Sequence, residues 1–233
     1  VETDRGLVLI DTGLGTQDYL HTQQRLGSLL TKFGAIVPDI HLSAFHQIQR
    51  LGYSLDDVKH IFVSHLDFDH AGGISDFPNA TVHVLASEFN ATQSLSLKGK
   101  NRYKTEQFKY HRYWNFAEQA DGEAWFNLQK VKGLPLFQDE ILMVPLIGHT
   151  LGHSAIAVKK QDGWILFCGD AYFSHLELNP KNKLRALDFT ERLLAEDNQQ
   201  RLHNLKQLQY LAQHEPSIEL ICAHDPVEFD RYQ

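Results

Sequence analysis

His65-Leu66-Asp67-Phe68-Asp69-His70-Ala71-Gly72-Gly73 is the stretch that decides the fold, because it places four potential metal ligands within six residues. It follows the run Ile61-Phe62-Val63, whose β-branched and aromatic side chains predict a buried strand. The potential ligands therefore lie on the loop at the carboxyl end of that strand, where a rigid element can hold them in place. In an extended segment side chains alternate, so His65, Asp67 and Asp69 would point to one side.

A structural role is the simplest alternative for any single residue of this stretch. One histidine before a loop is usually a buried or surface side chain with ordinary partners. Four imidazole and carboxylate groups so close together are difficult to explain in that way. Asp67 and Asp69 are neighbouring like charges, which cost free energy unless a cation lies between them. We therefore interpret the stretch as a metal-binding loop.

Three later segments repeat the arrangement of an apolar run followed by a histidine or an aspartate. They are Gly148-His149-Thr150 after residues 141–145, Cys168-Gly169-Asp170 after residues 164–167, and Ala223-His224-Asp225 after residues 218–222. Ligands that come from several strand ends are typical of an enzyme site on a layered α/β fold.

Together these motifs resemble those of the metallo-β-lactamase-fold hydrolases. That family carries a His-x-His-x-Asp-His motif followed by Gly-Gly, then a Gly-His-Thr loop, a bridging Asp and a last His, and the match covers residues 6–228. The resemblance implies an α/β fold, an αββα sandwich of two mixed β-sheets flanked by helices, formed by residues 1–233 as one domain. The segment 7–13 resembles the family's first loop, and the family's preceding strand is missing from the sequence given, so a native N-terminal strand or targeting signal before Val1 stays an open question.

The resemblance also implies two divalent metal ions per chain, with zinc as the first choice and manganese or iron as alternatives. The implied ligands are His65, Asp67 and His149 for the first ion, Asp69, His70 and His224 for the second, and Asp170 as a bridge between them. Asp11 would brace the ligand loop, as an outer partner of a metal site does. His153 would orient the His149 loop, or it would simply pack.

Position 67 departs from the usual family pattern, which has a second histidine there. Asp67 offers an anionic oxygen in place of a neutral nitrogen. With two divalent ions, three aspartates and a hydroxide, the centre would be neutral, whereas a histidine would leave it positive. We expect weaker Lewis acidity and a greater preference for manganese or iron than the usual pattern gives. Some lactonase-like relatives carry the same His-x-Asp-x-Asp-His form.

Composition indicates a soluble enzyme rather than a nucleic-acid or membrane protein. The chain has 233 residues, 42% of them hydrophobic, which is enough for one sizeable core. Its net charge is −7, and no basic tract is present for binding nucleic acid. No apolar stretch approaches the ~20 residues of a membrane span. Cys168 and Cys222 are expected to be buried thiols in a cytoplasmic protein, with a disulfide or a thiolate ligand as the alternatives.

Residues 98–130 form a segment rich in aromatic side chains between two predicted strands. The resemblance implies that an insertion here shapes the substrate pocket, with Tyr103, Tyr113 and Trp114 as candidate contacts. A satellite core or a dimer contact explains the same composition equally well. Apolar spacing predicts one helix over residues 18–33 and another over residues 189–214.

The expected activity follows from the implied metals. A hydroxide bridging the two ions would attack an ester-type carbonyl, while the ions stabilise the developing oxyanion. Asp69 would accept or relay the proton. The resemblance to lactonases implies that Tyr172, close behind the bridging aspartate, binds the substrate carbonyl or the leaving group, and packing in a strand is the equal alternative. A lactone is the first choice of substrate, and a thioester of the hydroxyacylglutathione type is the second. A non-hydrolytic iron, redox or metal-binding member of the fold remains the alternative from another class. The partners expected are a small molecule and a second copy in a homodimer.

Overall fold

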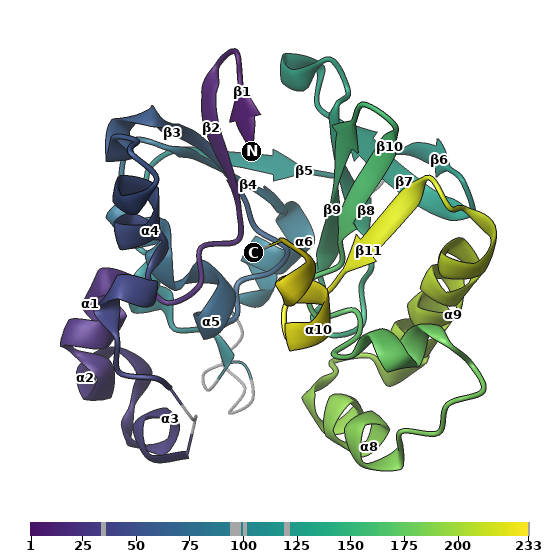
Figure 1. The fold of residues 1–233 in the computed structure, drawn as a ribbon. Helices are drawn as coiled ribbons and strands as arrows, with labels where there is room; N and C mark the ends of the chain where they lie inside the picture. The colour runs from purple at the N-terminus through teal and green to yellow at the C-terminus, as the bar shows by residue number, and fades with distance from the viewer. Residues whose placement is uncertain (34–35, 94–98, 100–101, 119–121, 233) are drawn as a thin grey trace. The chain divides into compact units, whose positions relative to one another are not determined.

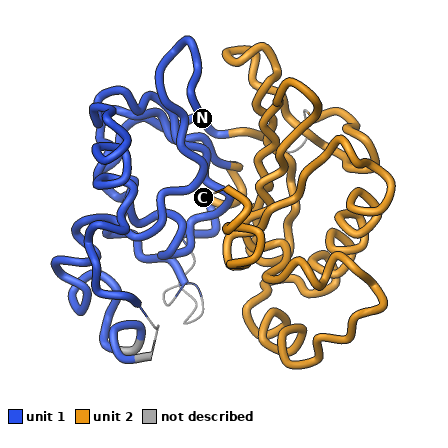
Figure 2. Tube along the Cα trace, in the orientation of Figure 1, with its two compact units in different colours: residues 1–84, 89–116 blue, residues 85–88, 117–233 orange. Residues whose placement is uncertain are grey.

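The computed structural model describes residues 1–33, 36–93, 99, 102–118 and 122–232 of the chain (Figure 1). Unit 1 comprises Val1–Val84 and Phe89–Phe116, and unit 2 comprises Leu85–Glu88 and Ala117–Gln233 (Figure 2). Each unit contains one mixed β-sheet, flanking helices and a hydrophobic core of its own.

The sheet of unit 1 has the strand order β1-β2-β3-β4-β5. Its strands are β1 (Glu2–Thr3), β2 (Gly6–Ile10), β3 (Val58–Phe62), β4 (Thr81–Leu85) and β5 (Trp114–Ala117). β1 pairs with β2 in the antiparallel sense, whereas β2, β3 and β4 run parallel. Because β2 and β3 are parallel neighbours, their carboxyl ends deliver Asp11 and His65 to the same edge of the sheet.

The helices of unit 1 are short. They are α1 (Thr16–Leu20), α2 (Thr22–Leu26), α3 (Ser28–Phe33), α4 (Ala44–Arg50) and α5 (Phe68–Ala71), while α6 (Ala86–Ala91) has residues in both units. The single helix predicted over residues 18–33 is therefore wrong. His21 ends α1, and Gly27 ends α2 with a φ of 88°, a left-handed conformation that continues no helix.

The sheet of unit 2 has the order β11-β10-β9-β8-β7-β6. Its strands are β6 (Glu123–Trp125), β7 (Leu128–Gly133), β8 (Ile141–Pro145), β9 (Ser154–Lys160), β10 (Gly163–Phe167) and β11 (Ile218–Ile221). Only β10 and β11 are parallel among the described pairs of this sheet. The apolar runs that precede His149, Asp170 and His224 thus form strands, as the sequence predicts.

Two helices replace the long helix predicted over residues 189–214. α8 (Arg185–Leu194) ends at Ala195, and α9 (Asn198–His214) begins after Asp197, whose side chain accepts a hydrogen bond from the backbone N–H of Gln200 at 3.0 Å. An aspartate at a helix N-cap stabilises the first turn, so the break lies where the sequence places this capping residue. The last helix, α10 (Pro226–Phe229), follows His224.

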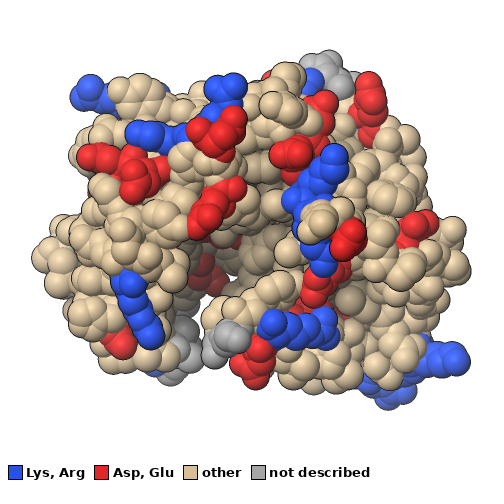
Figure 3. Space-filling model, turned by 45° about the horizontal axis from the view of Figure 1, so that its top comes forward, with Lys and Arg blue, Asp and Glu red and all other residues tan. Residues whose placement is uncertain are grey.

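No helix among the described residues is long and apolar enough to cross a membrane. On the face shown in Figure 3, acidic and basic side chains are interspersed over the surface. This mixed distribution agrees with the modest net charge of −7.

His83 gives unit 1 a pH-dependent stability. It is 2% exposed on β4, stacks on Phe62 at a centroid distance of 4.4 Å, and lies 3.0 Å from the Nδ1 atom of His60. Burial, and to a lesser degree the nearby His60, lowers the pKa of His83 from 6.5 to about 3. The unfolded chain therefore binds a proton between these two pH values that the folded chain does not bind, and acidification favours unfolding.

We expect the free energy of unfolding to fall below pH 6.5, with this one site contributing up to about 1.4 kcal/mol per pH unit. Urea unfolding of the His83→Gln variant, measured from pH 6.5 to pH 4, should show a shallower pH dependence than the parent protein. The exposed His203 on α9 supplies the control substitution His203→Gln. Equal slopes for all three proteins would contradict the assignment.

Candidate metal centre

The loop after β3 forms the first cluster of candidate ligands, and it lies entirely within unit 1. His65 is 0% exposed, and its Nε2 atom lies 3.4 Å from Oδ2 of Asp67. Asp67 is the N-cap residue of the single-turn helix α5, which turns the chain so that the rings of His65 and His70 lie 4.0 Å apart between centroids. Asp69 is the most accessible of the four, with its side chain 34% exposed. This loop brings together the four residues that the sequence predicts.

Asp11 holds this loop from the end of β2. Its carboxylate accepts hydrogen bonds from the backbone N–H and the hydroxyl of Ser64 at 2.6 and 2.7 Å, and from Nδ1 of His70 at 2.7 Å. Asp11 has a φ of 53°, in the left-handed region that aspartate and asparagine tolerate better than most residues. Since Nδ1 of His70 donates to Asp11, the metal-binding role falls to Nε2. This geometry is the bracing role that the resemblance implies for Asp11.

Close backbone approach explains the glycines that end the motif. A Cβ atom at Gly72 would lie 2.4 Å from Oδ2 of Asp18 and 2.7 Å from the carbonyl oxygen of Gly13. A Cβ atom at Gly73 would lie 2.9 Å from the Cβ of Thr12, whose hydroxyl donates to the carbonyl oxygen of His70. Only glycine lets the ligand loop pack this closely against the segment after β2.

Two residues that sequence reasoning missed also hold the ligand loop. Nη1 of Arg102 donates to Oδ2 of Asp67 at 2.7 Å. Nε2 of Gln107 donates to the carbonyl oxygen of Phe68 at 2.9 Å and to Oδ2 of Asp18 at 2.9 Å. No motif in the sequence marks either residue.

The aromatic segment that contains Arg102 and Gln107 mainly completes the core of unit 1. Tyr103 is 6% exposed and lies in the main cluster of buried apolar side chains, while Trp114 packs against that cluster. Tyr113 is 53% exposed. Tyr103 and Trp114 therefore pack in the core of unit 1, which was the alternative that composition left open, and their contact with a substrate stays a prediction. The predicted insertion also includes residues 98, 100–101 and 119–121, which lie outside the described residues.

The second cluster of candidate ligands lies within unit 2. Oδ2 of Asp170 is 3.4 Å from Nε2 of His149, and Oδ1 of Asp170 is 3.1 Å from Nε2 of His224. Asp170 and His149 are buried, whereas the side chain of His224 is 40% exposed. A carboxylate that presents one oxygen to each of two imidazoles has the shape that a bridging ligand requires.

His153 connects Asp170 to the strand behind it. Its Nδ1 atom lies 3.1 Å from the carbonyl oxygen of Leu146, and its Nε2 atom accepts the backbone N–H of Asp170 at 3.0 Å. Both ring nitrogens therefore have protein partners, which fixes a neutral tautomer with the proton on Nδ1. In this geometry His153 supports the cluster and offers no lone pair to a metal.

Tyr172 does not occupy the position that a catalytic role requires. It is 0% exposed in the core of unit 2, and its hydroxyl donates to the carboxylate of Glu228 at 3.1 Å. Phe173 instead lies beside the ligands, with its ring centroid 6.0 Å from that of His149 and 5.2 Å from that of His224. The chain bends after the turn at Asp170, and this bend directs Tyr172 into the core while Phe173 lies beside the ligands.

The two cysteines are free thiols in the core of unit 2, as expected. Burial, followed by the nearby Cys222 and Glu228, raises the pKa of Cys168 well above its usual value. Burial likewise raises the pKa of Cys222, whose backbone N–H donates to Glu228 at 2.8 Å. Thiols that resist ionisation are poor metal ligands, so the candidate donors are histidines and aspartates.

A hydrogen-bonded pair supports the last ligand. Asp225, next to His224, accepts from the backbone N–H of His175 at 2.5 Å and lies 2.6 Å from Nδ1 of the same residue. Burial acts to raise the pKa of Asp225, but hydrogen bonds from His175 and Val227 outweigh it and lower the pKa to about 2. The turn that carries His224 is therefore anchored by a carboxylate that stays ionised near neutral pH.

The donor atoms in both clusters fit a divalent metal ion. They are imidazole nitrogens and carboxylate oxygens, and the hydrogen bond from His70 to Asp11 orients the His70 ring as a metal ligand usually is. Such donors suit zinc, manganese and iron.

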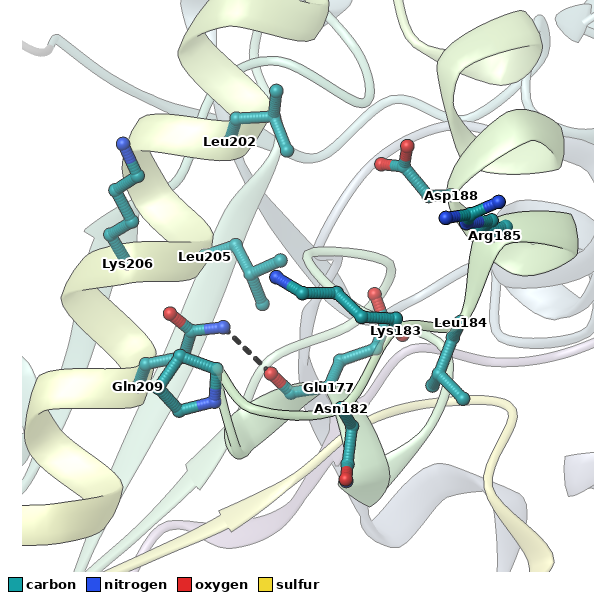
Figure 4. A pocket seen from close by; sticks show the side chains of 11 residues that line it. Glu177, Asn182, Lys183, Leu184, Arg185, Asp188, Leu202, Leu205, Lys206 and Gln209 are labelled. Carbon is teal, nitrogen blue, oxygen red and sulfur yellow. Dashed lines mark hydrogen bonds between the residues drawn. The ribbon is translucent and has the colours of Figure 1, made fainter.

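The described part of unit 2 also has a pocket of about 430 Å³ that includes none of the candidate ligands (Figure 4). Its walls come from α8, α9 and the segment between β10 and α8, with Lys183, Arg185 and Lys206 around the apolar Leu202 and Leu205. Gln209 donates to the carbonyl oxygen of Glu177 at 2.8 Å on one side.

Comparison with known proteins shows similarity over the whole chain. The family model described as "Metallo-beta-lactamase superfamily" matches residues 1–213. A probable metallo-hydrolase of Mycobacterium tuberculosis is 38% identical over 239 residues, which is 100% of this chain and 74% of that protein. An N-acyl homoserine lactonase of Bacillus thuringiensis is 28% identical over 177 residues, covering 75% of this chain and 62% of that enzyme.

Solved structures show the same fold. An N-acyl homoserine lactone hydrolase with its product N-hexanoyl-L-homoserine at the catalytic metal centre gives a TM-score of 0.72 at 23% identity, covering 100% of this chain and 82% of that one. The dizinc quorum-quenching lactonase AidC gives 0.60 at 17% identity, covering 97% and 70%. The predicted fold class, two mixed sheets with flanking helices, is confirmed.

Proposed function

Because this chain belongs to the metallo-β-lactamase superfamily, we propose that it is a metal-dependent hydrolase that opens an ester-type carbonyl, most simply a lactone. The observation that carries this proposal is the pair of histidine–aspartate clusters: in the first, Asp11 orients the ring of His70, and in the second, His153 holds the backbone of Asp170. A purely structural role would not require such oriented donors at strand ends.

The proposed centre combines the two clusters. His65, Asp67 and His149 are the proposed ligands of one ion, Asp69, His70 and His224 those of the other, and Asp170 the shared ligand. When bound, divalent ions supply Lewis acidity toward a carbonyl oxygen and make water a better nucleophile near neutral pH. The distances from Asp170 to His149 and His224, both within unit 2, support the bridging role.

Two side chains of the protein, Asp69 and Phe173, are proposed to act on the proton and on the substrate. Asp69 is the most accessible carboxylate of the ligand loop, with its side chain 34% exposed, so we assign it the role of accepting the proton of the attacking water. Phe173, which lies beside His149 and His224, gives the unit 2 cluster an apolar neighbour suited to an alkyl or acyl group. Because Phe173 lies there, we favour a substrate with an apolar group.

The lactone is favoured as the substrate class by the relatives. The Bacillus thuringiensis enzyme is named as an N-acyl homoserine lactonase, and its similarity covers 75% of this chain. The hydrolysis of a lactone breaks one C–O bond and adds water, and it needs no other reactant.

Metal content and substrate preference test the proposal in one preparation. Elemental mass spectrometry of protein purified without added metal should find about two zinc, manganese or iron ions per chain. The same sample should hydrolyse a lactone series faster than matched thioesters. Faster turnover of thioesters would replace the lactone by the second substrate class. Redox-active iron without hydrolysis of either series, or no metal even after reconstitution, would overturn the hydrolase proposal.

A further inference from the structure

Arg102 and Asp67 form a buried ion pair at one of the proposed metal positions. Nη1 of Arg102 lies 2.7 Å from Oδ2 of Asp67, and the two side chains are only 6% and 13% exposed. An arginine in this setting stays charged, because its pKa lies far above neutrality. Removing either partner would take from the other, still buried, an opposite charge at hydrogen-bond distance, which is costly.

This ion pair contains Asp67, the residue at which the chain differs from the usual family pattern. The family pattern places a neutral histidine there, whereas this chain has a carboxylate. Arg102 contributes one positive charge at hydrogen-bond distance from that carboxylate. We propose that Arg102 and Asp67 act as one electrically neutral unit that takes the place of the histidine, with Arg102 as a positioning residue for the first metal ion. This inference rests on the proposed two-metal function.

The proposal corrects the charge balance expected from the sequence. Counting the aspartates alone makes the centre neutral and predicts weak Lewis acidity. Including Arg102 restores one positive charge, the balance of a centre with a histidine at position 67. With Arg102 counted, the carboxylate of Asp67 no longer predicts metal ions of weaker Lewis acidity than a histidine at position 67 would give.

A second contact shows that the same segment positions the ligand loop. Gln107, five residues after Arg102, donates to the carbonyl oxygen of Phe68 at 2.9 Å. The segment thus holds two consecutive residues of the loop, Asp67 through its carboxylate and Phe68 through its backbone. Arg102 fixes the orientation of the Asp67 carboxylate, while Gln107 fixes the chain beside it.

A double-mutant cycle separates a functional pair from a coincidental contact. The four proteins are the parent, Arg102→Gln, Asp67→His, and the double variant that restores neutrality. Arg112→Gln removes the same charge at an exposed position of the same segment and serves as the control. Two quantities are measured: urea unfolding of the metal-free proteins, and zinc dissociation constants from competition with a chelator.

Each single substitution should lower the unfolding midpoint of the metal-free protein, and the double variant should recover most of the loss. Asp67→His alone should weaken zinc binding at least about ten-fold, because the charge of Arg102 near the cation is then no longer offset by Asp67. The zinc dissociation constant of the double variant should return to within about three-fold of the parent. Additive losses, or an Arg102→Gln protein indistinguishable from the parent and from Arg112→Gln, would overturn the pairing. If the parent binds no zinc, the proposed function fails. The unfolding midpoints of the four metal-free proteins still decide whether Arg102 and Asp67 act as one unit.

Discussion

Asp170→Asn is expected to reduce kcat/KM for the hydrolysed substrate by more than the ~10- to 100-fold typical of losing an outer partner of a metal site. Asp170 is 5% exposed and presents one oxygen to His149 and the other to His224. Asparagine keeps the shape and the backbone N–H that donates to His153, but it removes the negative charge and replaces one carboxylate oxygen by an NH2 group, which cannot ligate a cation.

Metal content and folding must be measured on the same Asp170→Asn protein. We expect less than the parent's metal stoichiometry by elemental mass spectrometry, and an unchanged far-ultraviolet circular dichroism spectrum. Asp162→Asn, at an exposed turn before β10, is the matched control. Turnover at the parent rate in the Asp170→Asn protein would rule out a bridging role and with it the two-metal hydrolase.

Asp11→Asn is expected to weaken metal binding by roughly 10- to 100-fold while leaving the fold intact. Asp11 touches no substrate in this proposal, and its carboxylate acts through His70 and Ser64. The amide keeps the size of the side chain and tolerates the φ of 53°. It cannot, however, accept all three hydrogen bonds as an ionised carboxylate does, so His70 loses its fixed orientation and part of its basicity.

Asp139 provides a closely matched control, since it also has a left-handed φ, 57°, at an exposed position in unit 2. Chelator competition should distinguish Asp11→Asn from both the parent and Asp139→Asn, and thermal unfolding of the metal-free proteins should show that each still unfolds cooperatively. Equal zinc affinity in all three proteins would show that the hydrogen bond from His70 to Asp11 does not support ligation.

The sequence predicted the strands and the ligand loops well, because both depend on local patterns. Apolar runs gave the strands that precede His65, His149 and Asp170, and the resemblance supplied the order of the ligands. The resemblance also implied that Asp11 supports the ligand loop, and its hydrogen bonds fit this role. Each strand and the ligand that follows it are encoded within a few residues of each other, whereas the role of Asp11 and the order of the ligands came from the resemblance.

What the sequence could not predict depends on packing between distant segments. Arg102 reaches Asp67 across 35 positions, and no short motif encodes that pairing. The choice between Tyr172 and Phe173 depends on how the chain bends after Asp170, which no short motif encodes. The break between α8 and α9, in contrast, could have been predicted from Asp197, a capping residue within an otherwise helical pattern.

The two clusters differ in how much of the chain each one needs. His65 to His70 form a short loop held by β2 and β3, whereas His149, Asp170 and His224 come together only when β8, β10 and β11 share one sheet. A substitution that loosens the second sheet would therefore separate these three donors long before it unfolds unit 1. The rate at which a chelator strips metal from the protein would then report on the integrity of that sheet, even for damage far from any ligand.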